Sequence, residues 1–440
     1  MSSHASTPRP LIRTEFPYAV EKLTQITVPL RDGVKLAGTI WLPKNETMES
    51  TVDTKFPAIL EYLPYRKADG TSIRDEIRLK YLAGFGYVSV RIDIRGSGNS
   101  EGIFDDEYSC QEQADCTEIL EWIAEQTWSN GKIVMFGKSW GGFNGLQMAA
   151  LQPKYLAGVI SAYSTDDRYS DDIHYCGGCI PASEACPPHP EYQGGIEAKS
   201  DLFAVWKDRL DNLVPLDTYW FKHQTRNSYW RHGKLFGFPS VQLSLSSNQP
   251  NALLCVRLCA IEPETCASIL VARGILNLTH FNSHEHPEEL EINKIYNIDV
   301  TLSGVCVRLS AGYRLRLAVS TAYWPFVWPS PQSATVTIHL NRSSPSVLIL
   351  PRLAHKCSSK PDFDLPEIAP GLKVITIRDD SISSIRTFDE INEISTLKIT
   401  KDNGCILYPD GHLFDETSES VYEINEYGPQ TARVQIQRNA

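Results

Sequence analysis

The residue with the clearest chemical potential in this sequence is Ser139, which lies between two glycines in the stretch FGKSWGGFNG. The pattern G-x-S-x-G, from Gly137 to Gly141, is typical of a sharp turn that exposes a serine hydroxyl to an acyl group. A serine hydroxyl is a weak nucleophile until a neighbouring base takes its proton, and a third group orients that base. The motif therefore raises the question of what positions the serine and where its base and acid lie.

The residues on either side of Ser139 predict a strand, a tight turn and a helix. Residues 132–136 form a short apolar run after a turn signal, which indicates a buried strand. Residues 141–153 are rich in helix formers and stop at a proline, which predicts a helix of about three turns. Because the turn is strained, side chains at positions 137 and 141 would collide with the neighbouring strand and helix. This setting favours a nucleophile elbow over a chance match to the motif.

The first 165 residues alternate between apolar strands and amphipathic helices. A hairpin is expected at residues 26–43, with Asp32-Gly33 at its turn. Ser109 and Glu112 offer a capping box to a helix at residues 109–128. The residues expected on the buried face of that helix are Cys116, Ile119, Leu120 and Ile123. The other expected elements are strands at residues 57–65, 87–96 and 156–163 and a helix at residues 73–86. This alternation predicts an α/β fold with a mostly parallel sheet covered on both faces.

The pattern changes after Tyr163. A loop rich in Asp, Cys, Gly and Pro runs to about Gly195, and an aromatic, helical segment follows it. From Phe238 onward, short runs alternate with period two between turn residues, which predicts an antiparallel sandwich or jelly roll. The expected domains are a polar leader at 1–20, an α/β core at 21–165, a loop and helical cap at 166–233 and a jelly-roll β-sandwich at 237–440.

Composition and charge narrow the choice of partners and compartment. The formal net charge is −11 and there is no long basic run, so no nucleic-acid partner is expected. No run of 18 apolar residues occurs, and the first residues lack the apolar core of a secretory signal, so no membrane partner is expected. These features predict a cytoplasmic protein whose 11 cysteines are free thiols.

Two further motifs resemble ligand-binding sequences, but a structural role is favoured for each. The stretch HYCGGCIPASEACPPH offers ligands in a spacing that could hold zinc, namely His174, Cys176, Cys179, Cys186 and His189. Only one tight C-x₂-C clip is present, so a loop with free thiols is favoured, and no metal or cofactor is expected. The stretch RGSGNSEG lacks the lysine of a phosphate loop and is interpreted as a turn after a strand, with Asp93 and Arg95 paired.

Several separate stretches resemble the CocE/NonD group of α/β-hydrolases, which includes cocaine esterase and the Xaa-Pro dipeptidyl-peptidases. They are EYLPYRK, RIDIRGSGNSEG, GKSWGG, DDRYSDDIHYCGGC, HQTRNSYWRHG, SVQLSLSS, ARGILNLTHFNSHE and AGYRLRLAVSTAYWPFVWPSP. The resemblance covers most of residues 20–350. It implies an α/β-hydrolase domain, an inserted helical cap and a C-terminal jelly roll. It also implies hydrolysis of esters, amides or Xaa-Pro peptides by a Ser–Asp–His triad.

The resemblance implies roles for three residues. Ser139 matches the nucleophile, and Tyr65, in LPYRK, matches the tyrosine whose hydroxyl helps to form the oxyanion hole. The backbone N–H of Trp140 would be the second donor. Independently, charge that develops on a substrate oxygen needs two fixed donors about 3 Å away, and the amide after the nucleophile points there in an elbow. Without the resemblance, the residues alone favour Tyr65 as a packing tyrosine at a strand end, because tyrosines are commonly half-buried.

The acid and base of the triad have no counterpart in this sequence. In the family they lie in Gly-Trp-x-Asp and Pro-Trp-x-His motifs, and neither motif occurs here. Instead, cap sequence passes into jelly-roll sequence near Gly233 to Phe236. The residues from which substitutes could come are Asp166, Asp167 and His174.

Two functional hypotheses follow. The first is a serine hydrolase that acts on small ester or amide substrates or on short peptides. The second is a non-catalytic, truncated family member that serves as a binding or assembly module through its jelly roll. In either case, loss of the later strands would leave residues 156–163 as an exposed apolar edge of the sheet, which favours a homo-oligomer.

Overall fold

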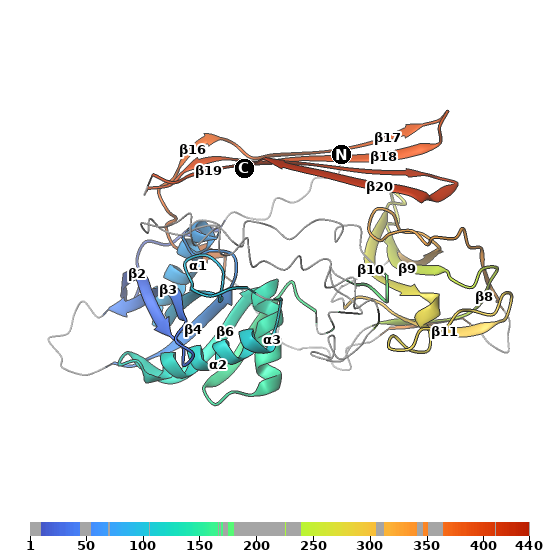
Figure 1. Ribbon diagram of the computed structural model, residues 1–440. Helices are drawn as coiled ribbons and strands as arrows, with labels where there is room; N and C mark the ends of the chain where they lie inside the picture. Colours follow the sequence, from blue (N-terminus) through green and yellow to red (C-terminus); the bar gives the residue numbers. More distant parts are fainter. Residues whose placement is uncertain are drawn as a thin grey trace.

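The computed structural model divides the chain into an N-terminal α/β domain, an all-β sandwich and a C-terminal sheet that lies along both (Figure 1). It describes residues 10–44, 54–68, 71–104, 106–165, 167, 169, 175–179, 225, 239–304, 312–340, 346–350, 364–409 and 411–439. Within these ranges, no helix has the length and apolar character needed to cross a membrane.

The α/β domain is built on a six-stranded sheet in the order β2-β3-β5-β4-β6-β7. Its strands are β2 (Ala19–Pro29), β3 (Lys35–Lys44), β4 (Phe56–Leu63), β5 (Val88–Asp93), β6 (Ser129–Lys138) and β7 (Leu156–Ala162). The pairs β4–β5, β4–β6 and β6–β7 are parallel, whereas β2–β3 and β3–β5 are antiparallel. The predicted α/β class with a mostly parallel sheet is confirmed.

The hairpin between β2 and β3 forms where its turn residues predict it. Gly33 has φ +94°, a conformation that a residue with a side chain rarely adopts. The Val34 N–H donates to the carboxylate of Asp32 at 3.0 Å, and the Leu30 and Val34 backbones bond to each other. The turn therefore depends on local chemistry that the sequence reveals.

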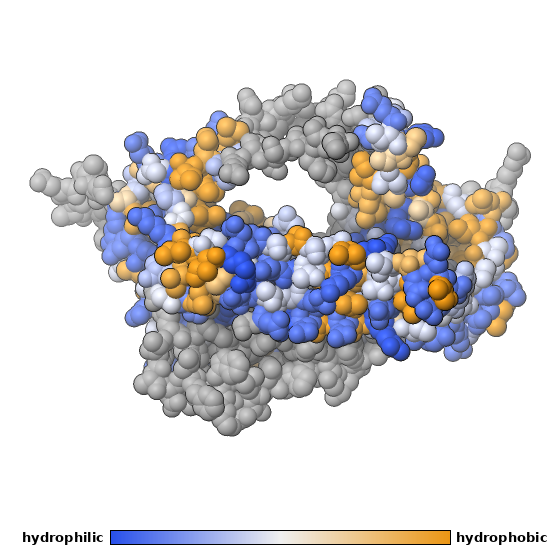
Figure 2. Space-filling model, turned by 90° about the horizontal axis from the view of Figure 1, so that it is seen from above, coloured by the Kyte–Doolittle hydropathy of each residue, from blue (hydrophilic) through white to orange (hydrophobic). Residues whose placement is uncertain are grey.

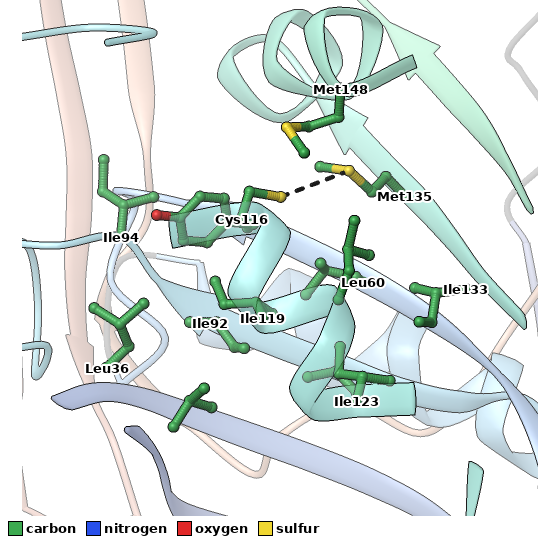
Figure 3. Packing of buried hydrophobic residues seen from close by; sticks show 14 of the residues in the cluster. Leu36, Leu60, Ile92, Ile94, Cys116, Ile119, Ile123, Ile133, Met135 and Met148 are labelled. Atoms are coloured by element: carbon green, nitrogen blue, oxygen red, sulfur yellow. Dashed lines mark hydrogen bonds between the residues drawn. The ribbon is translucent and has the colours of Figure 1, made fainter. Parts of the chain in front are cut away.

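Helices cover the sheet on two faces, and strand β5 shows the division. They are α1 (Ser72–Gly84), α2 (Cys110–Glu125) and α3 (Trp140–Leu151). Because side chains alternate along a strand, Val88, Val90 and Ile92 point into the core shared with α2 and α3. Figure 3 shows this packing, including the contact between the sulfur atoms of Cys116 and Met135 at 3.9 Å. The four residues predicted for the buried face of α2 are at most 1% exposed.

The other face of β5 carries charged side chains, and one ion pair predicted there from the sequence is wrong. Asp93 is paired with Arg91 at 3.3 Å, not with Arg95 as the sequence predicted. Arg91 lies two residues before Asp93 on the same strand, so both side chains leave the same face of the sheet. Strand β5 ends at Asp93, and the following turn directs Arg95 to Asp115 of α2 at 2.8 Å and to Asp32 at 2.7 Å.

The sandwich consists of two antiparallel sheets that enclose one apolar core. The first sheet has the order β10-β9-β12, and the second has the order β11-β8-β13 with β14 also on β8. The strands are β8 (Ser240–Ser247), β9 (Leu253–Ile261), β10 (Ser268–Asn277), β11 (Tyr296–Thr301), β12 (Arg314–Ser320), β13 (Val336–Ile338) and β14 (Val347–Ile349). Alternate residues such as Leu243, Leu245, Leu254 and Val256 fill the core. The predicted all-β C-terminal region is confirmed.

Residues 375–439, expected within the sandwich domain, form a separate antiparallel sheet. Its strands are β16 (Ile375–Arg378), β17 (Ser381–Asp389), β18 (Ile394–Leu407), β19 (Leu413–Asn425) and β20 (Gly428–Asn439). The register sets Leu397, Tyr422 and Val434 side by side on one face, whereas the Lys398–Glu419 ion pair lies on the other. Seen from above, this part of the molecule exposes hydrophilic residues interspersed with hydrophobic patches (Figure 2). The Tyr422 ring meets Trp324 of the sandwich region at 6.2 Å, so the apolar face is turned toward the body of the protein.

The end of the expected leader is tied to a distant segment. Strand β1 (Leu11–Ile12) pairs in parallel with β15 (Glu367–Ile368), and Arg13 forms an ion pair with Glu367 at 2.9 Å. Residues on both sides of the sandwich sequence thus meet beside α1.

Candidate functional site

Ser139 occupies the sharp turn between β6 and α3 that its motif predicts. Its backbone has φ 57° and ψ −121°, a region that residues with a side chain avoid. The Ser139 N–H donates to the carbonyl of Ala162 on β7 at 2.8 Å. Its own carbonyl accepts from the N–H groups of Gly142 and Phe143 at 2.7 and 3.0 Å. Neighbouring backbone therefore holds the strained residue from both sides.

The two glycines of the motif leave room for this turn. A Cβ atom on Gly137 would lie 2.1 Å from the backbone carbon of Gly141, inside the first turn of α3. A Cβ atom on Gly141 would lie 2.6 Å from a methyl group of Leu63 on the adjacent strand. The predicted collisions with helix and strand are confirmed, and glycine is the residue that avoids them.

Tyr65 lies beside Ser139 although 74 residues separate them. It follows the carboxyl end of β4, and β4 runs parallel to β6, so both chain ends reach the same edge of the sheet. The Tyr65 hydroxyl donates to Ser139 Oγ at 3.2 Å and accepts from the Trp140 backbone N–H at 3.3 Å. Burial raises the pKa of the Tyr65 phenol, although its contacts with Ser139 and Trp140 oppose that shift. The phenol is therefore a neutral donor at pH 7.

Charged groups under the sheet hold the strand end that carries Tyr65. The fully buried guanidinium of Arg91 donates to the carbonyl of Leu63 at 3.2 Å. The carboxylate of Asp93 accepts from the backbone N–H of Lys67 at 2.9 Å. These bonds bracket Tyr65 on both sides along the chain, which fixes its backbone relative to β5.

A buried carboxyl group that the sequence did not mark as part of a site lies behind the elbow. Glu112, on α2, accepts from the Trp140 indole N–H at 2.9 Å, from the Asn144 carboxamide at 3.1 Å and from the Tyr108 backbone N–H at 2.9 Å. Burial raises the pKa of Glu112 to about 7, against the lowering effect of these three bonds. The only sequence signal was its capping-box position: the Glu112 N–H does bond to Ser109 Oγ, at 3.2 Å. No spacing in the sequence connects Glu112 with Trp140.

The residues considered as substitutes for the acid and base do not complete a triad in the described part of the chain. Asp166 and His174 lie outside the described residues. Asp167 is buried, and its carboxylate accepts from the Tyr169 N–H at 3.1 Å. Within the described residues, no histidine forms a hydrogen bond with the Ser139 hydroxyl.

The described histidines and cysteines of the two stretches rich in these residues have contacts away from Ser139. His280 is buried, with its Nδ1 3.5 Å from the Tyr169 hydroxyl and 3.3 Å from a ring nitrogen of His284. Cys176 and Cys179 are buried, and their backbones bond to each other across a tight turn. His189 and Cys186 lie outside the described residues. Among the residues that the structure describes, no three His, Cys, Asp or Glu side chains are grouped so as to hold a metal ion.

Comparison with known protein families divides the chain where its sequence pattern changes. Residues 32–238 match the family of X-Pro dipeptidyl-peptidases (S15 family). Residues 233–360 match the C-terminal non-catalytic domain of X-Pro dipeptidyl-peptidases. The two matches meet at residues 233–238, the region where cap sequence was predicted to pass into jelly-roll sequence.

Individual proteins similar to this chain come from the same group of hydrolases. The cocaine esterase of Rhodococcus sp. is 32% identical over 163 residues, which are 36% of this chain and 26% of that esterase. This chain therefore spans about a quarter of the length of the curated relatives it matches. Among solved structures, a CocE/NonD family hydrolase from Staphylococcus aureus has a TM-score of 0.57 at 14% identity, covering 75% of this chain and 93% of that one. An alpha-amino acid ester hydrolase has a TM-score of 0.60 at 14% identity, covering 80% and 100%. At these identities the structures establish a shared fold.

Proposed function

This chain belongs to the CocE/NonD and X-Pro dipeptidyl-peptidase family of hydrolases, and we propose that it transfers acyl groups to water through Ser139. The substrates would be small esters or amides or short Xaa-Pro peptides. One observation carries the proposal: a strained serine whose Oγ lies 3.2 Å from the Tyr65 hydroxyl, beside the Trp140 N–H.

The geometry supports a defined division of labour. Ser139 Oγ would attack the substrate carbonyl, and its proton would pass to a base. The Tyr65 O–H, which now donates to Ser139 Oγ, and the Trp140 N–H, which now donates to the Tyr65 oxygen, would then both donate to the oxyanion of the tetrahedral intermediate. Collapse of the intermediate releases the alcohol or amine and leaves an acyl-serine that water hydrolyses. One oxyanion donor is worth on the order of 10²–10³ in rate.

The missing triad motifs limit how fast this chemistry would run. Hydrolases without their triad retain roughly 10³–10⁴-fold rate enhancement over water through substrate binding and the oxyanion hole. A chain with the serine and both donors, but without an assembled base, would therefore be a slow hydrolase. Strong activity would require a base from a residue outside the described ranges.

A second function is favoured by the same gap in the sequence. The chain lacks both motifs that carry the family's acid and base, and its residues 233–360 match a domain described as non-catalytic. On this alternative the chain binds or assembles through its all-β part.

A fluorophosphonate probe, which labels activated serines, separates the two functions. We expect wild-type protein to be labelled, Ser139→Ala to lose the label, and Ser268→Ala, an exposed serine on β10, to keep it. Hydrolysis of p-nitrophenyl acetate should follow the same order. Absence of labelling in the folded wild type would favour the non-catalytic function.

A further inference from the structure

We propose that Glu112 is a positioning residue of this site, which holds Trp140 and the first turn of α3 so that the Trp140 N–H and the Tyr65 O–H converge. The inference rests on the proposed function, because these two groups are the oxyanion donors assigned there. The described hydrogen bonds of the Glu112 carboxylate go to Trp140, Asn144 and Tyr108 and not to Ser139. Glu112 would therefore affect the reaction only through these neighbours.

One carboxylate oxygen holds both ends of the first helical turn behind Ser139. Oε1 of Glu112 accepts from the indole N–H of Trp140 at 2.9 Å and from the carboxamide of Asn144 at 3.1 Å. These residues are four apart on α3, so they lie one above the other on the same helix face. Because both side chains are held, the first turn of α3 cannot rotate about the helix axis. The direction of the Trp140 backbone N–H is thereby fixed.

The same network reaches the strand that carries Tyr65. The Asn144 carboxamide also donates to the carbonyl of Tyr62 on β4 at 2.6 Å, three residues before Tyr65. The second oxygen of Glu112 accepts from the Tyr108 N–H at 2.9 Å, which anchors the carboxylate to the start of α2. Glu112 thereby connects α2, α3 and β4, the elements around the two donors.

The indole ring of Trp140 has one polar group, its N–H, which needs a hydrogen-bond acceptor when the ring is buried. The ring is 3% exposed and packs against Phe104 and Tyr108, with ring centroids 5.6 and 4.9 Å away. An indole N–H buried without an acceptor would lose roughly 1–3 kcal/mol of hydrogen bonding. In this apolar enclosure Glu112 is the acceptor, so removing it would release the ring and the turn attached to it.

The donors around Glu112 favour its ionised form. All three are N–H groups, and an ionised carboxylate only accepts, whereas a protonated one would turn a donor toward another donor. Because burial raises the pKa of Glu112 to about 7, its ionisation changes in the neutral range.

Six other charged or titratable groups lie near Glu112 in the described part of the chain. They are Glu107, Asp106, Asp115, Cys116, Tyr62 and Arg95. Burial raises the pKa of both Tyr62 and Cys116 well above neutrality, and Arg95 is paired with Asp115. Glu107 raises the pKa of Glu112 further.

The test compares Glu112→Gln with Glu125→Gln, an exposed glutamate on the same helix. Three quantities are measured from pH 5.5 to 9: the rate at which a fluorophosphonate modifies Ser139, the hydrogen exchange of the amides of residues 139–144, and the melting temperature. Glutamine keeps one acceptor oxygen but replaces the other with an NH₂ donor, so it cannot accept from the Trp140, Asn144 and Tyr108 N–H groups together. We therefore expect Glu112→Gln to slow modification at pH 8 by about tenfold or more. We also expect the rate of the wild type, but not of Glu112→Gln, to rise with pH around 7. The Trp140 amide should exchange faster in Glu112→Gln, with no loss of melting temperature, and Glu125→Gln should match the wild type.

The outcomes separate this inference from the proposed function. If Ser139 of the wild type is not modified, the proposed function fails, and exchange of the Trp140 amide then decides the inference alone. An unchanged exchange rate in Glu112→Gln, or an unchanged modification rate and pH profile, would overturn it. Should Glu112→Gln not fold, Trp140→Phe removes the same bond from the other side. It should then slow modification and speed the exchange of the residue 140 amide, and wild-type values would overturn the inference.

Discussion

The backbone of Ser139 is held in a conformation that costs about 1–3 kcal/mol. Its amide is bound to Ala162, and its carbonyl is bound to Gly142 and Phe143. The result is a hydroxyl that projects from a turn rather than packing along a strand or helix. Proteins retain such strain where the surrounding structure compensates for it, and here the compensation comes from β7 and the first turn of α3.

Gly137→Ala should be strongly destabilising, because its Cβ would lie 2.1 Å from the backbone of Gly141. Neither backbone segment can move without breaking the bonds of the elbow, so we expect a loss of about 2–4 kcal/mol in unfolding free energy. The control is Gly158→Ala on β7, where a Cβ meets no atom within 4 Å. Urea denaturation of both variants measures the difference, and equal stabilities would contradict this account of the turn.

Tyr65→Phe should lower the reaction rate of Ser139 while leaving the fold intact. The change removes the hydroxyl that lies between Ser139 Oγ and the Trp140 N–H and keeps the ring. If the hydroxyl is an oxyanion donor, ester hydrolysis should fall roughly 10²–10³-fold through kcat. Tyr427→Phe, at an exposed tyrosine, is the matched control. A rate within twofold of the wild type would assign Tyr65 to packing instead.

Strand β7 both supports the site and forms one edge of the sheet among the described residues. Its last residue, Ala162, accepts the amide of Ser139, whereas its outer side has no strand neighbour among the described residues. Ile160 on this strand is 54% exposed. An unpaired apolar edge is a template for pairing with another chain. The sequence predicted this edge from the loss of later strands.

Ile160→Lys should therefore reduce self-association. A charge on an edge strand opposes pairing with a second edge, while an exposed position tolerates the change. We expect the wild type to show concentration-dependent association in sedimentation velocity and the variant to show less. Ile292→Lys, at an isoleucine 57% exposed outside the sheet, should leave association unchanged. A monomeric wild type at all concentrations would disprove the prediction.

Across the whole molecule, two buried titratable groups give the α/β domain and the sandwich opposite responses to acid. Burial raises the pKa of Glu112 to about 7. Burial, and then the neighbouring His284, lower the pKa of His280 to about 4. In the unfolded chain these groups titrate near their ordinary values, about 4.3 and 6.5. The domains that contain them are thus linked to pH with different signs.

Acidification from pH 7 to 5 should stabilise the α/β domain and weaken the sandwich. Folded Glu112 holds a proton that the unfolded chain has lost, so its contribution is complete below about pH 4.3 and disappears as the pH rises through 7. Between about pH 4 and 6.5, His280 is neutral in the folded protein but protonated in the unfolded chain. Its contribution to the free energy of unfolding is therefore present above about pH 6.5 and is lost as the pH falls through 4. Each shift corresponds to at most about 3.5 kcal/mol of unfolding free energy.

Hydrogen exchange resolved by domain measures both responses. Glu112→Gln should reduce the pH dependence in the α/β domain alone, where burial also raises the pKa of Glu61 and Asp93, and His280→Asn should reduce it in the sandwich alone. If either substitution changed both domains equally, or neither, the two groups would not be the source of the linkage.

Features that depend only on neighbours along the chain could be predicted from the residues. Hydrophobic periodicity located the elements of the α/β domain and the strands of the sandwich, and turn chemistry located the hairpin at Gly33 and the elbow at Ser139. These features are local, because the period of the side chains and the conformations that glycine permits are properties of short segments. Family motifs added Tyr65 to the candidate site, which the residues alone left open as a packing tyrosine.

Contacts between groups that are distant along the chain became known from the folded structure alone. It brought Tyr65 to Ser139, attached Glu112 to Trp140, and paired Arg95 with Asp115 rather than Asp93. It also separated residues 375–439 into a sheet of their own. Such contacts depend on the order of strands in a sheet and on how helices pack across it, and neither is a property of a short segment. Many arrangements satisfy the same local periodicity, and burial of the whole core selects among them.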